Sequence, residues 1–428
     1  MYRYNKILGE MTMSEAVLIS AVRTPVGNYG GCLRNIPAYD ILALVLNELV
    51  RRAKIESSLI DTVIIGQNYQ SGEYVNIARM SLLKAGWPED IPAFTLDRRC
   101  CSGLDAIGLA AMMIQTGNTA LIAAGGVESM STAEFYIPGE SIKWGIGGSG
   151  DMPKGHGSLS ILGLPLYDRI QRARVMSQPE QRFGVLPTMM TWAETAAREH
   201  GLTREDADQW ALRSHQKAVA AIESGKFVEE IVPVPVPGAK GEPRLFDKDE
   251  RPRPDTSLEA LSKLKPVLGG VCTAGNSAGE NDGAAVCLVA SEEKARELGV
   301  VPMAYLKSYV TSGVDPRYTW KSLPVAVTKA LEKTRLTLDQ IDLIELHEAF
   351  ATQTLANLKE LGITKKDYDK VNVNGSCIAI GHPLGCTGAR ILTTLLYEMK
   401  RRNARYGLEA ICGGGGMGVC AIVERKQA

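Results

Sequence analysis

The sequence of 428 residues has no excess of charge of either sign, because 48 Lys and Arg residues balance 48 Asp and Glu residues. Nucleic-acid-binding proteins usually carry a basic excess, so this balance argues against a nucleic-acid partner. Long apolar runs are also missing. Residues 104–114 form one of the longest runs and contain a charge, whereas a membrane span needs about 20 apolar residues. We therefore expect neither a nucleic-acid partner nor a membrane-embedded protein.

Targeting signals and disulfide patterns are also missing. Residues 1–10 are polar and lack the apolar core of a secretory signal, and the sequence does not end in Ser-Lys-Leu. The nine cysteines are odd in number and include no Cys-x-x-Cys pair. This pattern argues against a disulfide scaffold and against a zinc ribbon. We expect a cytoplasmic protein with free thiols and no metal.

Aromatic residues make up only 6% of the chain. Glycine is abundant instead: the 43 glycines are about 10% of the 428 residues, above the usual proportion of about 7%. The glycines cluster at 125–126, 145–150, 269–283 and 413–418. Strands are predicted over 16–20, 61–66, 91–96 and 120–124, and helices over 39–53, 75–85 and 104–116. This alternation predicts an α/β fold with a mostly parallel sheet.

The alternation stops between residues 131 and 264 and returns after residue 300. We interpret 131–264 as an insertion, partly loop, with helices near 189–199 and over 204–224. Ile341, Cys386 and Leu408 repeat the surroundings of Ile60, Cys101 and Leu121, at offsets of 281, 285 and 287 residues. A nearly constant offset indicates two copies of one α/β half. We expect one half in 14–130 with 265–295, an inserted loop domain in 131–264, and the second half in 296–428.

Four residues at predicted strand ends or helix starts could carry chemistry. Cys100 precedes a helix, whose free N–H groups would lower the thiol pKa and could bind an oxyanion; the alternative is a buried cysteine in a helix cap. His382 lies in Gly-His-Pro-Leu-Gly and would be the base for a thiol, or it caps a turn. Cys412 precedes four glycines that could hold a phosphate or a reacting carbonyl. His347 ends a strand, where it could simply bind the backbone.

Taken together, two thiols and two imidazoles from the loops of duplicated halves suit one kind of chemistry. One thiol can be acylated, an imidazole can take its proton, and the second thiol can move a proton to carbon or to a leaving sulfur. The set predicts acyl transfer through a thioester, or carbon–carbon cleavage of a 3-oxo thioester.

The sequence resembles the thiolase family from about residue 15 to residue 425. Five motifs carry the resemblance: Cys-Cys-Ser-Gly-Leu at 100–104, Gly-Gly-Val-Glu-Ser-Met-Ser at 125–131, the Thr-Ala-Gly-Asn to Asn-Asp-Gly-Ala-Ala block at 273–285, Gly-His-Pro-Leu-Gly-Cys-Thr-Gly-Ala-Arg at 381–390, and Cys-Gly-Gly-Gly-Gly-Met-Gly at 412–418. The resemblance implies the thiolase fold. Its two duplicated βαβαβαββ halves would form α/β/α/β/α layers, with an inserted loop domain.

The resemblance also implies roles for individual residues. Cys100 would be the nucleophile, His382 its base, and Cys412 the second acid/base. The oxyanion holes would use the N–H groups of Cys100 and Gly414 together with His382 and His347. Coenzyme A and acyl-CoA thioesters would be substrates, with no bound cofactor. The CoA contacts would be Arg253, Leu268 and Ala278. A homodimer or dimer of dimers is implied, in some members with a second, unrelated subunit.

Four departures from the family pattern bear on the substrate, and one is the insertion 131–264, which is glycine-rich and unlike the common pattern from 139 to 187. His347 replaces an Asn before Glu-Ala-Phe, Thr188-Met189-Met190 replaces His-Met-Gly, and Leu268 and Ala278 replace a Phe and a Ser beside pantetheine. From them we expect thiolysis, or the reverse Claisen condensation, of an acyl group that is bulky, aromatic, branched or dicarboxylic, as in the degradation of an aromatic compound.

Other functions remain as alternatives. The first is an ordinary acetyl-CoA acetyltransferase or a fatty-acid 3-oxoacyl-CoA thiolase of β-oxidation. A non-catalytic thiolase-fold subunit and a decarboxylating ketosynthase-like enzyme are disfavoured because Cys412 accompanies Cys100 and His382.

Overall fold

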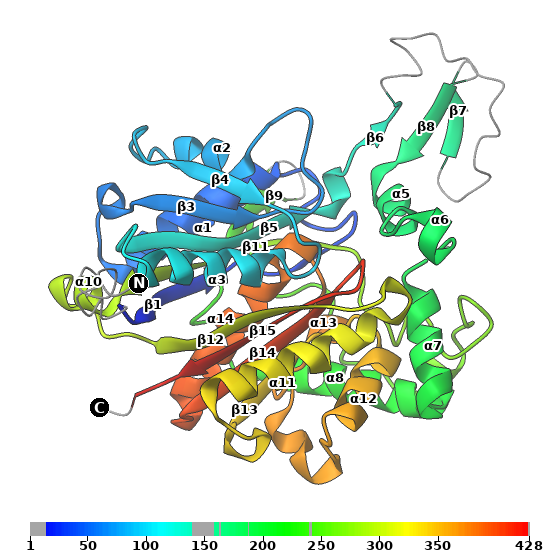
Figure 1. Ribbon diagram of the computed structural model, residues 1–428. Coiled ribbons are helices and arrows are strands. Elements are labelled where there is room, and N and C mark those ends of the chain that lie inside the picture. Colours follow the sequence, from blue (N-terminus) through cyan, green and yellow to red (C-terminus); the bar gives the residue numbers. More distant parts are fainter. Residues whose placement is uncertain (1–13, 139–157, 162–163, 187, 239–241, 427–428) are drawn as a thin grey trace, which may run out of the picture.

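The computed structural model describes residues 14–138, 158–161, 164–186, 188–238 and 242–426, so the polar residues 1–10 and the glycines of 145–150 lie outside the described residues. The main sheet has the order β13-β14-β15-β12-β1-β11-β5-β3-β4, and β2 pairs with β11 (Figure 1). Its ten strands are β1 (Ala16–Arg23), β2 (Gly27–Asn28), β3 (Thr62–Gly66), β4 (Ala93–Leu96), β5 (Leu121–Ser129), β11 (Asn281–Ser291), β12 (Ala304–Gly313), β13 (Leu343–Leu346), β14 (Tyr406–Gly413) and β15 (Met417–Glu424).

The two halves of this sheet repeat one pattern, which confirms the predicted duplication. In β1-β11-β5-β3 the three pairings are antiparallel, antiparallel and parallel. The pairings of β12-β15-β14-β13 follow the same sequence. Both first strands also carry a register shift at the same place, between Leu18 and Ser20 in β1 and between Leu306 and Ser308 in β12.

The expectation of a mostly parallel sheet is wrong. Parallel pairing joins β3 to β4, β3 to β5 and β13 to β14, whereas β1, β11, β12 and β15 pair antiparallel with their neighbours. The reason is visible between β14 and β15, where three glycines make a turn too short for the crossover that parallel strands require. The sheet is therefore mixed.

Helices lie on both outer faces and between the halves, giving the expected α/β/α/β/α layers (Figure 1). The first outer layer holds α1 (Ala38–Ala53) and α2 (Ile77–Lys84), the middle layer α3 (Ser102–Gln115) and α14 (Thr387–Arg402), and the other outer layer α11 (Ser322–Thr334) and α12 (Ala351–Glu360). Alternate residues along a strand point to opposite faces of the sheet and pack into different hydrophobic cores. Val63 and Ile65 of β3 enter the core under α1, and Ile64 enters the core of the middle layer.

The middle layer brings the starts of α3 and α14 into contact through two glycines. A Cβ atom on Gly388 would lie 2.5 Å from the backbone nitrogen of Leu104, and one on Gly103 would lie 2.8 Å from the carbonyl oxygen of Gly385. Such distances exclude any side chain, so glycine is required at both helix starts. The contact places the loop before α3 beside the loop before α14.

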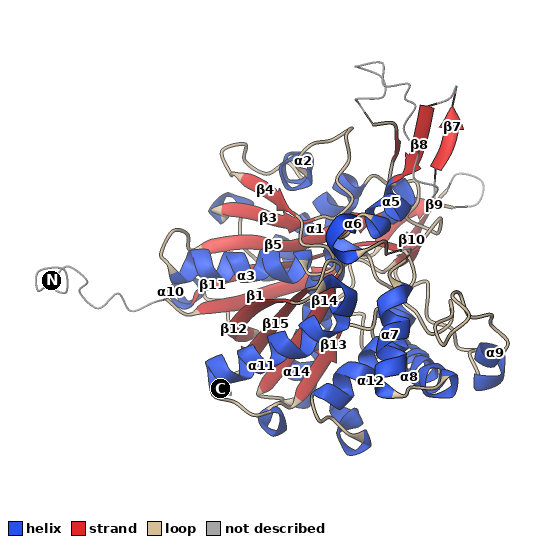
Figure 2. Cartoon of the chain, turned by 45° about the vertical axis from the view of Figure 1, so that its right-hand side comes forward, coloured by secondary structure: helices blue, strands red, loops and turns tan. Residues whose placement is uncertain are grey.

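The described residues of the segment 131–264 form helices and strands that are mostly short, apart from α7 and α8. They are β6 (Phe135–Tyr136), β7 (Ser158–Ile161), β8 (Leu164–Asp168), α5 (Arg169–Val175), α6 (Glu180–Phe183), α7 (Met190–His200), α8 (Arg204–Glu223), β9 (Val234–Pro237), β10 (Pro243–Phe246) and α9 (Leu258–Ser262). Figures 1 and 2 show β7 and β8 projecting from the body. The predicted helices at 189–199 and 204–224 are confirmed as α7 and α8, and their Trp192 and Trp210 pack into the core of the second half.

Two further short α-helices are α10 (Glu292–Glu297) and α13 (Cys377–Ile380). Within the described part of the chain, no helix combines the length and the apolar character that crossing a membrane would require.

Candidate active site

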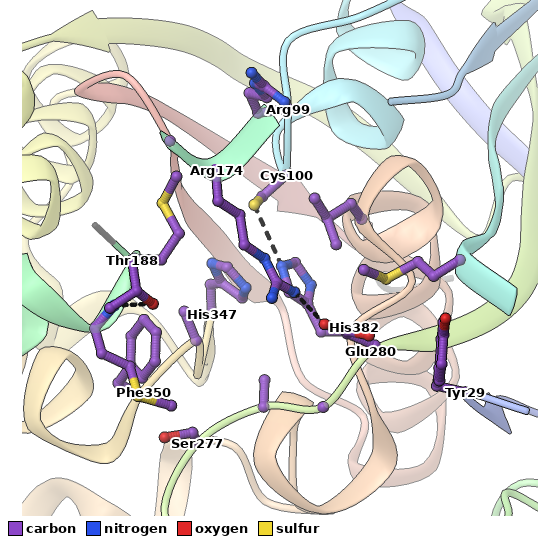
Figure 3. A pocket seen from close by; sticks show the side chains of 18 of the residues that line it. Tyr29, Arg99, Cys100, Arg174, Thr188, Ser277, Glu280, His347, Phe350 and His382 are labelled. Carbon is purple, nitrogen blue, oxygen red and sulfur yellow. Dashed lines mark hydrogen bonds and ion pairs between the residues drawn. The ribbon is translucent and has the colours of Figure 1, made fainter. Parts of the chain in front are cut away.

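Loops of both halves and of the segment 131–264 surround a cavity of about 760 Å³ (Figure 3). Cys100, His347, His382, Cys412 and Gly414 all line it. The structure therefore brings together the four side chains that sequence reasoning selected, although they are up to 312 positions apart in the chain.

Cys100 sits in a tight turn between β4 and α3. Arg99 adopts a left-handed conformation with φ of 53°. The Ser102 hydroxyl stabilises this turn by accepting a hydrogen bond from the Arg98 N–H at 2.8 Å and donating one to the Arg99 carbonyl at 2.7 Å. The turn presents the Cys100 sulfur to His382, whose Nε2 lies 3.2 Å away (Figure 3).

The expectation that the helix end lowers the pKa of Cys100 is wrong. Burial raises the pKa of the Cys100 thiol to about 12, because a thiolate in this site loses its water. The N–H groups of Gly414 and of Cys100 itself point at the sulfur and act in the opposite direction, without overcoming burial. Cys100 is therefore a neutral thiol before substrate binds.

The hydrogen bonds of His382 determine its tautomer, and hence that the nitrogen facing Cys100 is an acceptor. The Thr387 hydroxyl donates to the carbonyl oxygen of Pro383 at 2.9 Å, so it must accept from His382 Nδ1, which lies 2.7 Å away. A neutral ring with its proton on Nδ1 has a lone pair on Nε2. That lone pair is directed to the Cys100 thiol, as a general base requires.

His382 is neutral in the resting site. Burial lowers its pKa well below the usual value, and His347, Arg390 and Arg174 act in the same direction. Its backbone is also fixed, because the His382 N–H donates to Asn281 Oδ1 at 2.8 Å. His382 can therefore take the proton of Cys100 when the thiol attacks, whereas a permanent thiolate–imidazolium pair is disfavoured.

Cys412 and His347 form a second pair beside the first, with the His347 and His382 ring centres 4.4 Å apart. His347 Nδ1 lies 3.1 Å from the carbonyl oxygen of Cys412 and 3.6 Å from its sulfur. A carbonyl oxygen only accepts, so the proton of His347 is on Nδ1 and its Nε2 is an acceptor. Burial lowers the pKa of His347 to about 3 and raises that of Cys412 well above its usual value. Cys412 is thus a protonated thiol, suited to donating a proton first.

The turn between β14 and β15 supplies a backbone donor to the site. Gly415 and Gly416 have φ of +88° and +77°, and a Cβ atom on Gly416 would lie 2.2 Å from the carbonyl oxygen of Val314. The turn therefore requires glycine at these two positions, which explains two of the four consecutive glycines. In this arrangement the Gly414 N–H points at the Cys100 sulfur, where an acyl oxygen would develop charge.

Sequence reasoning missed the residues that hold these loops together. The buried Glu128 carboxylate accepts the N–H groups of Asn68 at 3.0 Å, Tyr69 at 3.1 Å and Gly385 at 2.9 Å. It thereby joins the loop after β3 to the loop that carries His382. Glu128 lies in a motif that the sequence does show, but nothing in its spacing indicates this bracing role.

Glu348 has the same function on the other side of the site. It accepts from Trp210 Nε1 at 3.0 Å, Ser214 Oγ at 2.7 Å and Asn372 Nδ2 at 2.8 Å. These bonds fix α8 against the loop that follows His347.

Comparison with known proteins identifies the family of the chain. The model of the thiolase N-terminal domain matches residues 16–293, and that of the thiolase C-terminal domain matches residues 300–425. The chain belongs to the thiolase family. It is an acyltransferase, as the relatives named below also indicate.

Similar thiolases are known both as sequences and as structures. The chain is 46% identical to an acetyl-CoA acetyltransferase of Syntrophomonas wolfei over 96% of this chain and 99% of that one. It is 42% identical to an acetyl-CoA acetyltransferase of Pseudomonas aeruginosa, over 96% of this chain and all of that one. The crystal structure of the Bacillus anthracis acetyl-CoA acetyltransferase superposes with a TM-score of 0.87 at 39% identity, covering 96% and 99% of the two chains. Human mitochondrial 3-ketoacyl-CoA thiolase gives a TM-score of 0.87 at 33% identity, covering 97% and 100%.

Thiolases use coenzyme A as a substrate, and two of the three residues expected to contact it line the cavity. Arg253 and Ala278 do so, together with Ser277. Leu268 is 45% exposed and is not among the described residues that line the cavity. Of the three expected CoA contacts, Arg253 and Ala278 therefore lie at the cavity that holds Cys100, and Leu268 lies outside its lining.

Among the described residues, one group of side chains has donor atoms close enough together to hold a metal ion. His347, Cys377 and His382 place one donor atom each within 4.8 Å of one another. However, the buried Arg390 donates to the Cys377 sulfur at 3.0 Å. A cation bound to these residues would lie against the Arg390 guanidinium, so the surroundings oppose metal binding.

Proposed function

We propose that this thiolase is an acetyl-CoA acetyltransferase, which cleaves acetoacetyl-CoA with coenzyme A and catalyses the reverse condensation. The names of the relatives at 42–46% identity support this substrate. They favour it over the bulky, aromatic, branched or dicarboxylic acyl group expected from the departures at 188–190, 268, 278 and 347. The single observation that carries the chemistry is the Cys100 sulfur 3.2 Å from a His382 nitrogen whose other nitrogen is held by Thr387.

In the first half-reaction, Cys100 attacks the 3-oxo carbon while His382 Nε2 takes the thiol proton. The bond between C2 and C3 breaks, and Cys412 gives its proton to C2, so that acetyl-CoA leaves and an acetyl group remains on Cys100. In the second half-reaction, the sulfur of CoA attacks this thioester and its proton passes to Cys412. Cys100 leaves as a thiolate and regains its proton from His382, which restores the starting state.

Two oxygens carry negative charge during these steps. The oxygen on the carbon attacked by Cys100 would lie between the N–H groups of Cys100 and Gly414. The thioester oxygen of the departing acetyl-CoA would accept from His382 Nε2 once that nitrogen is protonated. Because His347 Nε2 is an acceptor, we propose that His347 holds a water that donates to the same oxygen, rather than donating directly.

The test uses acetoacetyl-CoA and coenzyme A, with thiolysis followed as loss of the enolate absorbance. Cys100→Ser should reduce turnover to background, and the mass spectrum of the variant after exposure to acetyl-CoA should show no acetyl adduct. Cys101→Ser is the matched control, since Cys101 is the adjacent, buried thiol and has no part in the proposed steps. A wild-type protein that neither turns over nor becomes acetylated would instead be a non-catalytic binding subunit.

We also infer that the protein is a homo-oligomer that associates through the edge of the sheet at β4. Phe94 of β4 is 37% exposed, and Val75 and Leu83 are exposed on and near α2 beside it. An exposed edge strand with apolar side chains favours pairing with a second copy of the chain.

A further inference from the structure

One wall of the cavity is an apolar cluster that the catalytic steps do not use. Tyr69, Met130 and Ile170 pack together there, with Ala173 and Leu384 against them. All of these except Ile170 also line the cavity that contains Cys100 and His382. The apolar cluster therefore offers an alkyl chain a surface close to the nucleophile.

An ion pair lies across the cavity close to this apolar cluster. Arg174 Nη2 and Glu280 Oε1 are 2.7 Å apart, their side chains are only 28% and 25% exposed, and both residues line the cavity. Figure 3 shows the Arg174 side chain reaching across the pocket to Glu280. The Arg174 charge is near enough to His382 and to Tyr69 to lower the pKa of each, although burial raises the pKa of Tyr69 overall.

The two ends of this ion pair are attached to different parts of the molecule. Glu280 is fixed to the catalytic loops, because its carbonyl accepts the Tyr29 N–H at 3.1 Å and its backbone pairs with that of His382. Arg174 lies on α5, which Asp168 caps by accepting the N–H groups of Ile170 and Gln171. The pair thus connects α5, in the segment 131–264, to the nucleophile's base.

We propose that the Arg174–Glu280 ion pair blocks part of the acyl pocket and thereby limits the acyl group of this thiolase to short, uncharged chains. An acetyl group on Cys100 adds only a carbonyl and a methyl group beyond the sulfur, which leaves the pair in place. A longer chain lying on the apolar cluster must displace the pair and separate two partly buried charges, which is unfavourable. A chain ending in a carboxylate would be attracted by Arg174 but repelled by Glu280, which already occupies that guanidinium.

This proposal rests on the proposed thiolase activity, and the experiment separates the two. Thiolysis is measured with acetoacetyl-CoA, 3-oxohexanoyl-CoA, 3-oxooctanoyl-CoA and 3-oxoadipyl-CoA. Arg174→Ala should raise kcat/KM for 3-oxooctanoyl-CoA relative to acetoacetyl-CoA by roughly tenfold, a typical effect of opening an apolar pocket. Arg172→Ala is the matched control on α5: its guanidinium lies over the Tyr167 ring, 4.8 Å from the ring centre, and it does not line the cavity.

A second variant shows whether the pair itself or merely the fold of α5 matters. The exchanged pair Arg174→Glu with Glu280→Arg should restore the preference of the wild type for acetoacetyl-CoA. The proposal is overturned if acetoacetyl-CoA is turned over by wild type while Arg174→Ala leaves the chain-length ratio unchanged. A wild-type preference for 3-oxooctanoyl-CoA or for 3-oxoadipyl-CoA would also overturn it. Loss of all turnover in the wild type would refute the proposed function instead.

Discussion

Replacing Thr387 by Val tests the assignment of His382 as the base, because the two side chains have nearly the same shape. In the wild type, the Thr387 hydroxyl accepts from His382 Nδ1 and donates to the carbonyl of Pro383. Valine has no acceptor, so the Nδ1–H would be left unpaired in a buried site. The ring could then move its proton to Nε2, where it would face Cys100 and could not accept the thiol proton.

The size of the effect follows from the lost hydrogen bond. Leaving one buried donor unpaired costs about 1–3 kcal/mol. Since each 1.4 kcal/mol is about tenfold in rate, kcat/KM for acetoacetyl-CoA should fall by about 5- to 140-fold. The loss should appear in kcat with little change in KM, because Thr387 does not line the cavity. Thr387→Ser, which keeps the hydroxyl, should recover most of the activity.

A matched control exists in the same helix. Thr393 is also buried in α14, and its hydroxyl donates to the helical carbonyl of Ala389 at 2.7 Å. Thr393→Val should therefore leave kcat close to the wild-type value. If both valine variants lose the same activity, or if Thr387→Val loses none, the tautomer argument for His382 is wrong.

Three further predictions use other parts of the site and surface. Cys412→Ser should slow thiolysis of acetoacetyl-CoA by about 100-fold or more, as expected for loss of a general acid. The same variant should slow acetyl exchange between acetyl-CoA and labelled CoA by a smaller factor. Equal loss of both activities would contradict the proton transfer to C2. Alkylation of Cys100 by iodoacetamide should accelerate about tenfold per pH unit from pH 7 to pH 10. With a pKa of about 12, only a small fraction of Cys100 is thiolate over this range, and that fraction rises tenfold per pH unit. If the rate, after subtraction of the Cys100→Ser background, is already constant from pH 7 upward, Cys100 and His382 instead form a preformed ion pair. Phe94→Arg should reduce the mass measured by analytical ultracentrifugation, and an unchanged oligomer would place the interface away from β4.

That Cys100, His347, His382 and Cys412 meet at one cavity could be predicted, because most of them lie in short glycine-rich loops. The helix predicted over 104–116 is α3, displaced by two residues at its start. The strand predicted over 120–124 continues to Ser129 as β5, through two glycines that normally disfavour strands. Glycine is needed there because a Cβ atom on Gly126 would lie 1.9 Å from the carbonyl oxygen of Gly385. That requirement comes from the other half of the chain and is not visible locally.

The features that could not be predicted depend on packing between distant segments. The pKa of Cys100 has the opposite sign from the expectation because burial outweighs the helix end, and burial is set by residues of both halves and of 131–264. The ion pair of Arg174 with Glu280 joins residues that are 106 positions apart, with nothing in either local sequence to connect them.

Burial also explains how the site can use groups that are inactive at rest. Cys100 and Cys412 are neutral thiols and His347 and His382 are neutral imidazoles, so none of the four side chains carries a charge that burial would penalise. In the proposed reaction a charge appears only when Cys100 attacks, and the N–H groups of Gly414 and Cys100 already point at that sulfur. Because these donors are held by the turn before α3 and the glycine turn after β14, they need no rearrangement as charge develops. The duplicated fold makes this possible, since one half presents the proposed nucleophile and the other presents the proposed base, acid and one oxyanion donor at the same cavity.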